Sequence, residues 1–396
     1  ASYRRQRQMC IRDRYYPITF LKKPLMSSKT NIAELIKKIH QSPLKLVIVS
    51  SGGGTNAIAS LLKVPGASQT VLESYIPYAR ESLAHYLLKE PDQYCSLDTT
   101  LSMAAKAYSA AKKIDTETNI DNLVGIGITA SFATTYEKKG EHRFYIALQT
   151  RDYSRSIECV ILKGKRSREE EEQLVTEYLV NLLAETIQLP FAYPDHEEKP
   201  VFKKVEADES WINLVNGDLD FVSSTKRVPE LIFPGAFNPL HSGHIAMKDL
   251  AEKKTGMEVS FEICIQNADK PPLSYHEIKR TIDQFSNGEN WVMTKAGMFF
   301  DKSSMFPNSV FIIGADTLVR ILDEKFYKNR KDMLDKLDLF NSHNINFLVF
   351  GRKVDSKFIS LKNVSLPEHI EKRFTGFDEE IFRDDISSTI LRLESQ

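Results

Sequence analysis

Cysteine is scarce in this sequence, with only four such residues among 396. They are far apart, none forms a C-x-x-C pair, and no histidine stands at the spacing of a zinc ligand. This scarcity predicts a chain from a reducing compartment that holds no structural metal. The four residues are Cys10, Cys95, Cys159 and Cys264.

An excess of either charge is also missing, because 53 lysines and arginines balance 53 aspartates and glutamates. This balance removes the broad basic field that non-specific nucleic-acid binding needs, so nucleic acid is not an expected partner. No apolar run approaches the roughly 20 residues with which a helix crosses a bilayer. We expect a soluble cytoplasmic protein that acts on small molecules, and the sequence leaves a homo-oligomer open.

The first residues carry no fold signal. Ala1–Arg14 holds five arginines and one aspartate without apolar periodicity, and no apolar stretch that could make a secretory signal follows it. We therefore treat residues 1–30 as an unstructured or non-native leader. An organellar transit peptide, and with it an organelle, stays open.

The remaining chain is longer than one hydrophobic core usually spans, which predicts two domains. Helical periodicity from Asn31 to His40, an apolar run from Leu44 to Val49 and a glycine-rich turn begin an alternation of helices and strands. The alternation continues through an amphipathic helix that ends near Ile187. We predict an α/β domain over residues 31–189, called the first module below.

Three prolines with mixed charges follow, and they predict a linker over residues 190–227. The second module, residues 228–396, again alternates strands and helices. Such alternation predicts a doubly wound, Rossmann-like parallel sheet with its ligand at the carboxyl ends of the strands. The expected strands include Leu231–Phe233, Glu258–Ile265, Val310–Ile313 and Asn346–Phe350.

The turn after the first of these strands has the composition of a phosphate site. Glycine lets backbone N–H groups approach a phosphate, and the following helix directs the positive end of its dipole at the same place. His241 and His244 lie three residues apart around Gly243, where both imidazoles can face one polyphosphate and stabilise its developing charge. The alternatives are a metal half-site or simple surface residues. For a zinc site, the sequence offers no third or fourth ligand nearby.

Two motifs in this module resemble the nucleotidyltransferase superfamily. They are the run from Gly235 to His244, which contains H-x-G-H, and Ile386–Arg392, which reads I-S-S-T-x-x-R. Between them, Phe311–Leu318 and Phe347–Arg352 are similar to nicotinamide or nicotinate mononucleotide adenylyltransferases, which share the cytidylyltransferase-like fold. The resemblance implies transfer of AMP from ATP to a phosphate-bearing acceptor, with Mg²⁺ carried by the phosphates and no metal bound by the protein itself.

The resemblance also assigns roles to residues. It implies His241, His244 and Arg392 as catalytic groups that contact the ATP phosphates. It implies nucleotide binding by Gly235, Ala236, Phe237, Asn238, Gly243, Gly314, Asp316, Arg352, Ser387, Ser388 and Thr389. Independently of it, hydroxyls at a helix start and an arginine one turn later suit an anion. Candidates for acceptor binding are Lys270, Arg280, Phe326 and Tyr327.

The first module resembles the C-terminal domain of CinA, a nicotinamide mononucleotide amidase family. The resemblance rests on the turn Ser50–Gly54, on Val64–Ser68 and on Tyr78. It implies that Ser50 stands at the place of the family's serine, but Leu83 stands where the family has a lysine that activates it. A serine without a base is a poor nucleophile, so an active amidase and a ligand-binding or structural module both stay open.

For the whole chain the leading hypothesis is an adenylyltransferase of pyridine-nucleotide metabolism. Two alternatives remain. One is nucleotidyl transfer to another phosphate acceptor such as phosphopantetheine, and the other is a catalytically inactive nucleotide-binding regulator.

Overall fold

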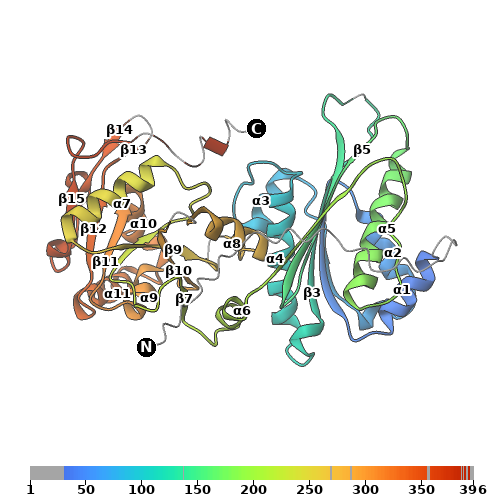
Figure 1. The fold of residues 1–396 in the computed structure, drawn as a ribbon, viewed down its shortest axis with the longest axis horizontal. Coiled ribbons are helices and arrows are strands. Elements are labelled where there is room, and N and C mark those ends of the chain that lie inside the picture. Colours follow the sequence, from blue (N-terminus) through green and yellow to red (C-terminus); the bar gives the residue numbers. More distant parts are fainter. Residues whose placement is uncertain are drawn as a thin grey trace, which may run out of the picture.

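A computed structural model describes residues 31–136, 138–267, 270–285, 288–354, 357–384, 386, 388, 391 and 392, folded around two large sheets (Figure 1). The first sheet has the strand order β2-β1-β3-β4-β5-β6. Its first three strands run parallel and the other three antiparallel. The strands are β1 (Lys45–Ser51), β2 (Val71–Tyr75), β3 (Leu123–Ser131), β4 (His142–Gln149), β5 (Tyr153–Ile161) and β6 (Val201–Glu206).

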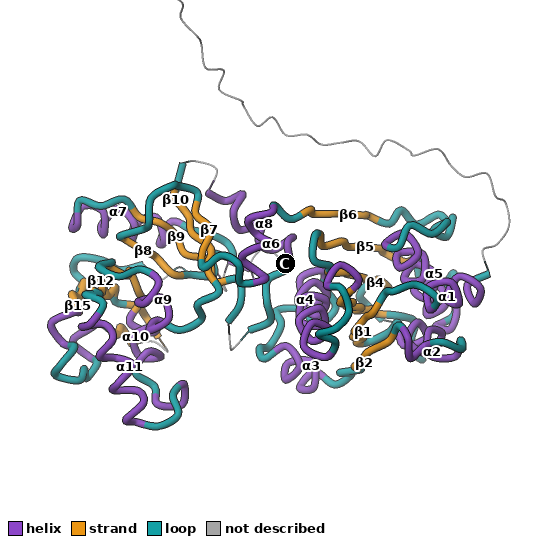
Figure 2. Tube along the Cα trace, turned by 90° about the horizontal axis from the view of Figure 1, so that it is seen from below, coloured by secondary structure: helices purple, strands orange, loops and turns teal. Residues whose placement is uncertain are grey.

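Helices cover both faces of this sheet, as Figure 2 shows. On one face α4 packs so closely on β3 that a Cβ on Gly125 would lie 2.1 Å from the backbone nitrogen of Tyr108. Glycine in β3 therefore sets the distance between helix and sheet. One face carries α3 (Arg80–Leu87) and α4 (Leu97–Ile114), and the other carries α1 (Ile32–His40), α2 (Thr55–Lys63) and α5 (Arg168–Thr186).

The second sheet has the strand order β15-β12-β11-β8-β9-β10-β7. All neighbours pair in parallel except β7, which runs antiparallel to β10 at the edge. Numbered along the chain, the parallel strands read 3-2-1-4-5-6, the Rossmann order, so the predicted fold class is confirmed. The strands are β7 (Phe221–Ser223), β8 (Leu231–Pro234), β9 (Val259–Cys264), β10 (Asn290–Thr294), β11 (Val310–Gly314), β12 (Asn346–Phe350) and β15 (Phe374–Phe377).

The strand order reverses between β8 and β11, and the crevice at their carboxyl ends is the place where such sheets bind ligands. Two apolar cores, one on each face of the sheet, hold the surrounding helices. The helices are α6 (Glu209–Asn216), α7 (Ser242–Thr255), α8 (Tyr275–Ile282), α9 (Phe299–Met305), α10 (Ala315–Ile321) and α11 (Arg330–Ser342). A small hairpin, β13 (Arg352–Val354) and β14 (Lys357–Ile359), follows β12.

The segment predicted as a linker, residues 190–227, is instead part of both modules. Its strand β6 extends the first sheet beside β5, and its strand β7 extends the second beside β10. Between them α6 buries Trp211 and Leu214 in the core of the second module. The prediction was wrong here because edge strands are exposed on one side, so their mixed charges resemble those of a loop.

The two modules touch along a surface that we call the seam. There Tyr275 of α8 donates its hydroxyl to the carbonyl of Arg151 at 2.6 Å, and its backbone N–H to Ser154 Oγ at 2.9 Å. Arg280, also on α8, pairs with Asp98 at 2.8 Å. The two hydrogen bonds of Tyr275, whose side chain is buried, fix the position of one module on the other.

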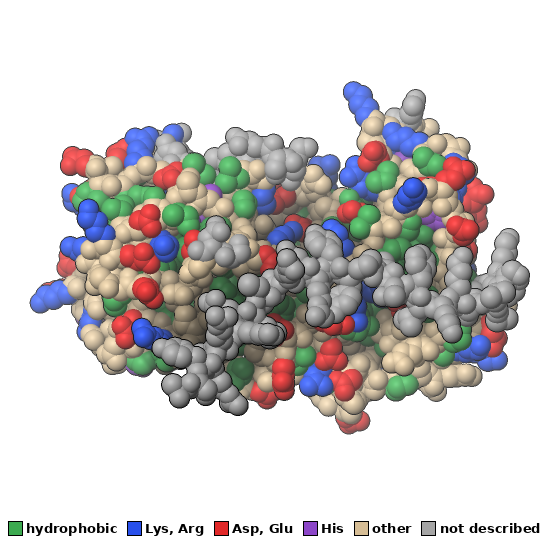
Figure 3. Space-filling view, in the orientation of Figure 1, with side chains coloured by type: hydrophobic (Ala, Val, Ile, Leu, Met, Phe, Trp, Pro, Cys, Tyr) green, Lys and Arg blue, Asp and Glu red, His purple; other side chains and the backbone are tan. Residues whose placement is uncertain are grey.

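The visible surface mixes acidic and basic side chains, in keeping with the equal numbers of the two charges (Figure 3). Within the described ranges, no helix is long and apolar enough to span a bilayer.

Candidate active site

The turn between β8 and α7 forms the floor of the candidate site. Phe237 takes a left-handed backbone conformation, with φ of 44°, and its side chain is only 1% exposed. Its ring meets Phe233, Phe261 and His244 edge to face, at a centroid distance of 5.1 Å from His244. Phe237 was expected to bind nucleotide, but its ring belongs to the core and supports the histidine from below.

His241 and His244 stack on each other at the start of α7. Their ring centroids lie 3.7 Å apart, and the backbone N–H of His241 donates to His244 Nδ1 at 3.3 Å. Because Nδ1 of His244 accepts a hydrogen bond, the proton of the neutral ring is on Nε2. Gly243 makes room for the pair, since a Cβ there would lie 2.7 Å from Asp384 Oδ2.

Both imidazoles are held in the neutral form. Burial lowers the pKa of His241, and it lowers the pKa of His244 to about 3, with the nearby His241 and Arg352 acting in the same direction. A neutral Nε2–H can still donate a hydrogen bond to a phosphate oxygen. An arriving polyphosphate would favour the protonated rings, so the pair can gain positive charge as the ligand gains negative charge.

A cavity of about 340 Å³ opens above the histidines at the point where the strand order reverses. Ser388, near the C-terminus, lies in its wall and donates its hydroxyl to the carbonyl of Pro239 at 2.9 Å. Arg352 and Asp316 face each other across another part of the wall, 3.3 Å apart. Of the nucleotide-binding candidates, the cavity is lined by Gly235, Ala236, Gly243, Gly314, Asp316, Arg352 and Ser388. The two motifs therefore meet at one cavity.

Ser387 and Thr389 lie outside the described residues. Among the described residues, no group of three or more His, Cys, Asp or Glu side chains could hold a metal ion.

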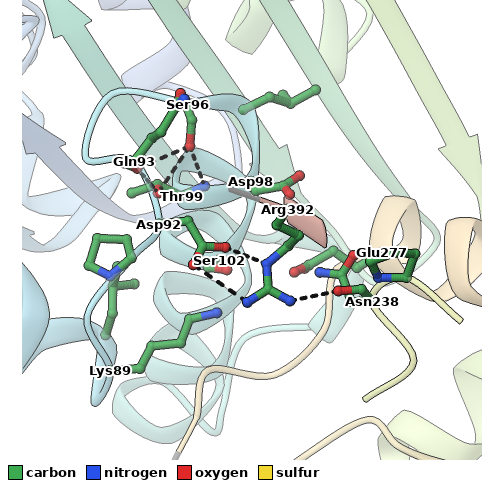
Figure 4. A pocket seen from close by; sticks show the side chains of 14 residues that line it. Lys89, Asp92, Gln93, Ser96, Asp98, Thr99, Ser102, Asn238, Glu277 and Arg392 are labelled. Carbon is green, nitrogen blue, oxygen red and sulfur yellow. Dashed lines mark hydrogen bonds and ion pairs between the residues drawn. The ribbon is translucent and has the colours of Figure 1, made fainter. Parts of the chain in front are cut away.

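Arg392 reaches this cavity and is held from two sides. Its Nη1 donates to the carbonyl of Asn238 at 2.6 Å, and its Nε donates to Asp92 of the first module at 2.6 Å (Figure 4). The carbonyl of Asn238, which lines a neighbouring cavity, thus serves to anchor the arginine. The sequence did not predict the contact of Arg392 with Asp92, because no motif links two residues that are 300 positions apart.

The acceptor candidates are divided among three cavities. Lys270 lines the cavity above the histidines and, with Arg280, a larger cavity at the seam. Phe326 and Tyr327 line a separate cavity of about 120 Å³, where the guanidinium of Arg320 lies 5.5 Å from the Phe326 ring centre. The sequence motifs were too weak to indicate that these four residues belong to different cavities.

The amidase-like residues of the first module do not form a nucleophilic site. Ser50 is fully buried and donates its hydroxyl to the carbonyl of Gly53 at 2.6 Å. Tyr78 is 63% exposed, whereas Leu83 is 1% exposed and packs in the core beneath α3. The Ser50 hydroxyl is shielded from substrate and donates to a carbonyl, which cannot act as its base. This geometry favours a structural role for Ser50.

Residues 232–394 match the cytidylyltransferase-like family. A curated relative, the "Putative nicotinamide mononucleotide adenylyltransferase" of Schizosaccharomyces pombe, is 31% identical over 140 residues. That alignment covers 32% of this chain and 55% of the relative, so the chain spans about half the length of the relative it matches. Both matches support nucleotidyl transfer as the chemistry of the second module.

Solved structures of the CinA family are neighbours of the N-terminal part. The competence/damage inducible protein CihA from Agrobacterium tumefaciens is 17% identical with a TM-score of 0.33, over 41% of this chain and 100% of its own. The CinA superfamily protein from Escherichia coli is 14% identical with a TM-score of 0.31, over 41% of this chain and 94% of its own.

Proposed function

We propose that the second module is an adenylyltransferase that joins AMP from ATP to a phosphate-bearing acceptor, with nicotinamide or nicotinate mononucleotide as the acceptor. The observation that carries the proposal is the stacked pair His241 and His244 in one cavity with Arg352, Ser388 and Arg392. Backbone N–H groups at the start of α7 add to this set of donors. The arrangement suits a triphosphate whose charge changes during reaction.

In the proposed reaction an oxygen of the acceptor phosphate forms a bond to the α-phosphorus of ATP. The bond from that phosphorus to the bridging oxygen breaks, and pyrophosphate leaves with the electron pair. No covalent intermediate with the protein is needed, so the protein contributes position and charge stabilisation. ATP arrives as its Mg²⁺ complex, and the metal belongs to the substrate.

Each donor has a place in this scheme. Nε2–H of His244 and the His241 ring face the polyphosphate, while Arg392 and Arg352 neutralise the charge on the departing pyrophosphate. Because Arg392 is fixed by Asn238 and Asp92, its guanidinium is oriented before the substrate arrives. Donors that are already in position stabilise the transition state without a reorganisation cost.

Pyrophosphate release from ATP tests the proposal, with nicotinamide mononucleotide, nicotinate mononucleotide and phosphopantetheine as separate acceptors. The full chain should release pyrophosphate with a pyridine mononucleotide. His244→Ala should lower kcat about a hundredfold or more, the usual effect of removing one such donor.

A matched control is His369→Ala, which removes an exposed histidine of the same module and should leave turnover unchanged. Near-normal turnover in His244→Ala would contradict the catalytic role assigned to His241 and His244. Turnover with phosphopantetheine alone would keep the chemistry and replace the acceptor, whereas ATP binding without turnover on any acceptor would favour a regulatory protein.

A further inference from the structure

A second, larger cavity lies at the seam. It joins the cavity above His241 and His244, which is called the nucleotide cavity below. The seam cavity measures about 530 Å³, within the range of small-molecule sites, and residues of both modules line it. The two cavities share Gly235 and Ala236 of the phosphate turn, together with Arg352 and Arg392. Molecules bound in the two cavities would therefore meet beside the turn, where the proposed reaction takes place.

The seam cavity has an excess of positive charge. Seven basic side chains line it against four acidic ones. Several of the carboxylates at the seam already have partners, because Asp92 pairs with Arg392 and Asp98 pairs with Arg280. A largely buried acid, Glu277, accepts hydrogen bonds from the backbone N–H and the hydroxyl of Ser274. Four of the seven basic side chains are already paired with carboxylates, namely Arg280, Lys302, Arg352 and Arg392. Lys89 forms none of these ion pairs and can attract an anion.

Lys89 is the first module's basic side chain in this wall. It follows α3, lines the cavity, and extends toward the Asp92–Arg392 pair (Figure 4). The seam contacts of α8 with Arg151, Ser154 and Asp98 hold the first module in place, so the distance of Lys89 from the phosphate turn is set by the fold. An ammonium group at such a position can bind a phosphate as a point charge.

We propose that the seam cavity is the acceptor site, and that Lys89 of the first module binds the phosphate of the acceptor. This proposal rests on the proposed function, because that function defines the reaction in which the acceptor takes part. It gives the first module a role that needs no amidase chemistry, since this module would complete the active site of the second. The ligand class is a phosphate monoester of a nucleoside, held between Lys89 and the turn.

Calorimetric titration of the full chain with nicotinamide mononucleotide measures this site without requiring turnover. The unmodified chain should bind it, and Lys89→Ala should weaken the affinity about tenfold or more through loss of a charge-assisted contact. Lys89→Arg should restore most of the affinity, which a purely structural role would not predict. The KM for the mononucleotide should rise in parallel in Lys89→Ala, while the KM for ATP stays within about twofold.

Lys63→Ala is the matched control, because Lys63 is an exposed lysine at the end of α2 on the opposite face of the first sheet. It should bind the mononucleotide like the unmodified chain. Equal affinity in Lys89→Ala and the unmodified chain, or no binding to either, would overturn the seam site. Lys89-dependent binding without pyrophosphate release would keep the seam site and refute the proposed function, so the two failures are distinguishable.

Discussion

The depressed pKa of His244 makes the stability of the second module depend on pH. In the folded chain its pKa is about 3, because burial, His241 and Arg352 disfavour the charged ring. In the unfolded chain the pKa is about 6.5. As the pH falls below about 6.5, His244 takes up a proton in the unfolded chain but stays neutral in the folded chain. The contribution of His244 to the free energy of unfolding is therefore fully present above about pH 6.5 and is lost as the pH falls toward 3.

The size of the effect follows from the two pKa values. Between pH 7.5 and pH 5, a histidine that titrates only when unfolded lowers the free energy of unfolding by about 2 kcal/mol. His244→Gln removes this titration and leaves His241 in place. The unmodified chain should therefore lose about 2 kcal/mol more than His244→Gln over that interval.

Urea unfolding followed by tryptophan fluorescence can measure this difference in the second module alone. The chain has two tryptophans, Trp211 in α6 and Trp291 in β10, and both belong to that module. His85→Gln, which removes an exposed histidine of the first module, should behave like the unmodified chain. Parallel pH profiles for the unmodified chain and His244→Gln would refute the burial argument and the neutral state assigned to the pair.

Two further changes test the packing on which the modules depend. Lys302→Met should lower the free energy of unfolding of the second module by about 3–5 kcal/mol in the same urea assay, because it leaves the buried Glu262 without its partner. Adding Glu262→Gln should recover part of that loss, and a neutral single variant would contradict the pairing. Ser50→Ala should lower stability by about 1 kcal/mol through the lost bond to Gly53 and leave any ammonia release from nicotinamide mononucleotide unchanged. A fall in ammonia release would show that the buried serine is reactive after all.

The ion pair between Asp92 and Arg392 joins the two modules beside the candidate site. Removing the first module would expose one side of the arginine and take away a wall of the seam cavity. A family resemblance at each end of the chain gives two separate functions by default. The seam cavity, lined by both modules, is the reason for our proposal that one active site uses residues from both.

Most of the regular structure could be predicted from local pattern. Amphipathic periodicity predicted α1 and α5, and apolar runs predicted β1, β8, β11 and β12, because these elements bury a regular side of their surface. The strands β5, β6 and β7 were not predicted. Each of them alternates apolar with polar side chains or exposes polar ones, so its sequence carries no continuous apolar run. Its extended conformation depends on hydrogen bonding to a neighbouring strand.

Within the site, the sequence by itself determined the chemistry of the turn. The order glycine, proline, histidine, glycine, histidine after a strand decides which donors lie together, since all fall within one turn and one helix start. The spacing of the C-terminal hydroxyls and Arg392 is equally local. That the two motifs border one cavity also followed from the resemblance, and the structure brings Ser388 and Arg392 to His241.

Only the tertiary structure decided where the remaining groups act. The ring of Phe237 lies in the core, and Arg280 pairs with Asp98. Asp92 pairs with Arg392 of the second module, and Lys89 lines the seam cavity. Contacts between residues hundreds of positions apart depend on how two finished surfaces fit together. Local pattern encodes each surface, but the register between them is fixed by packing and hydrogen bonds that exist only once both modules have folded.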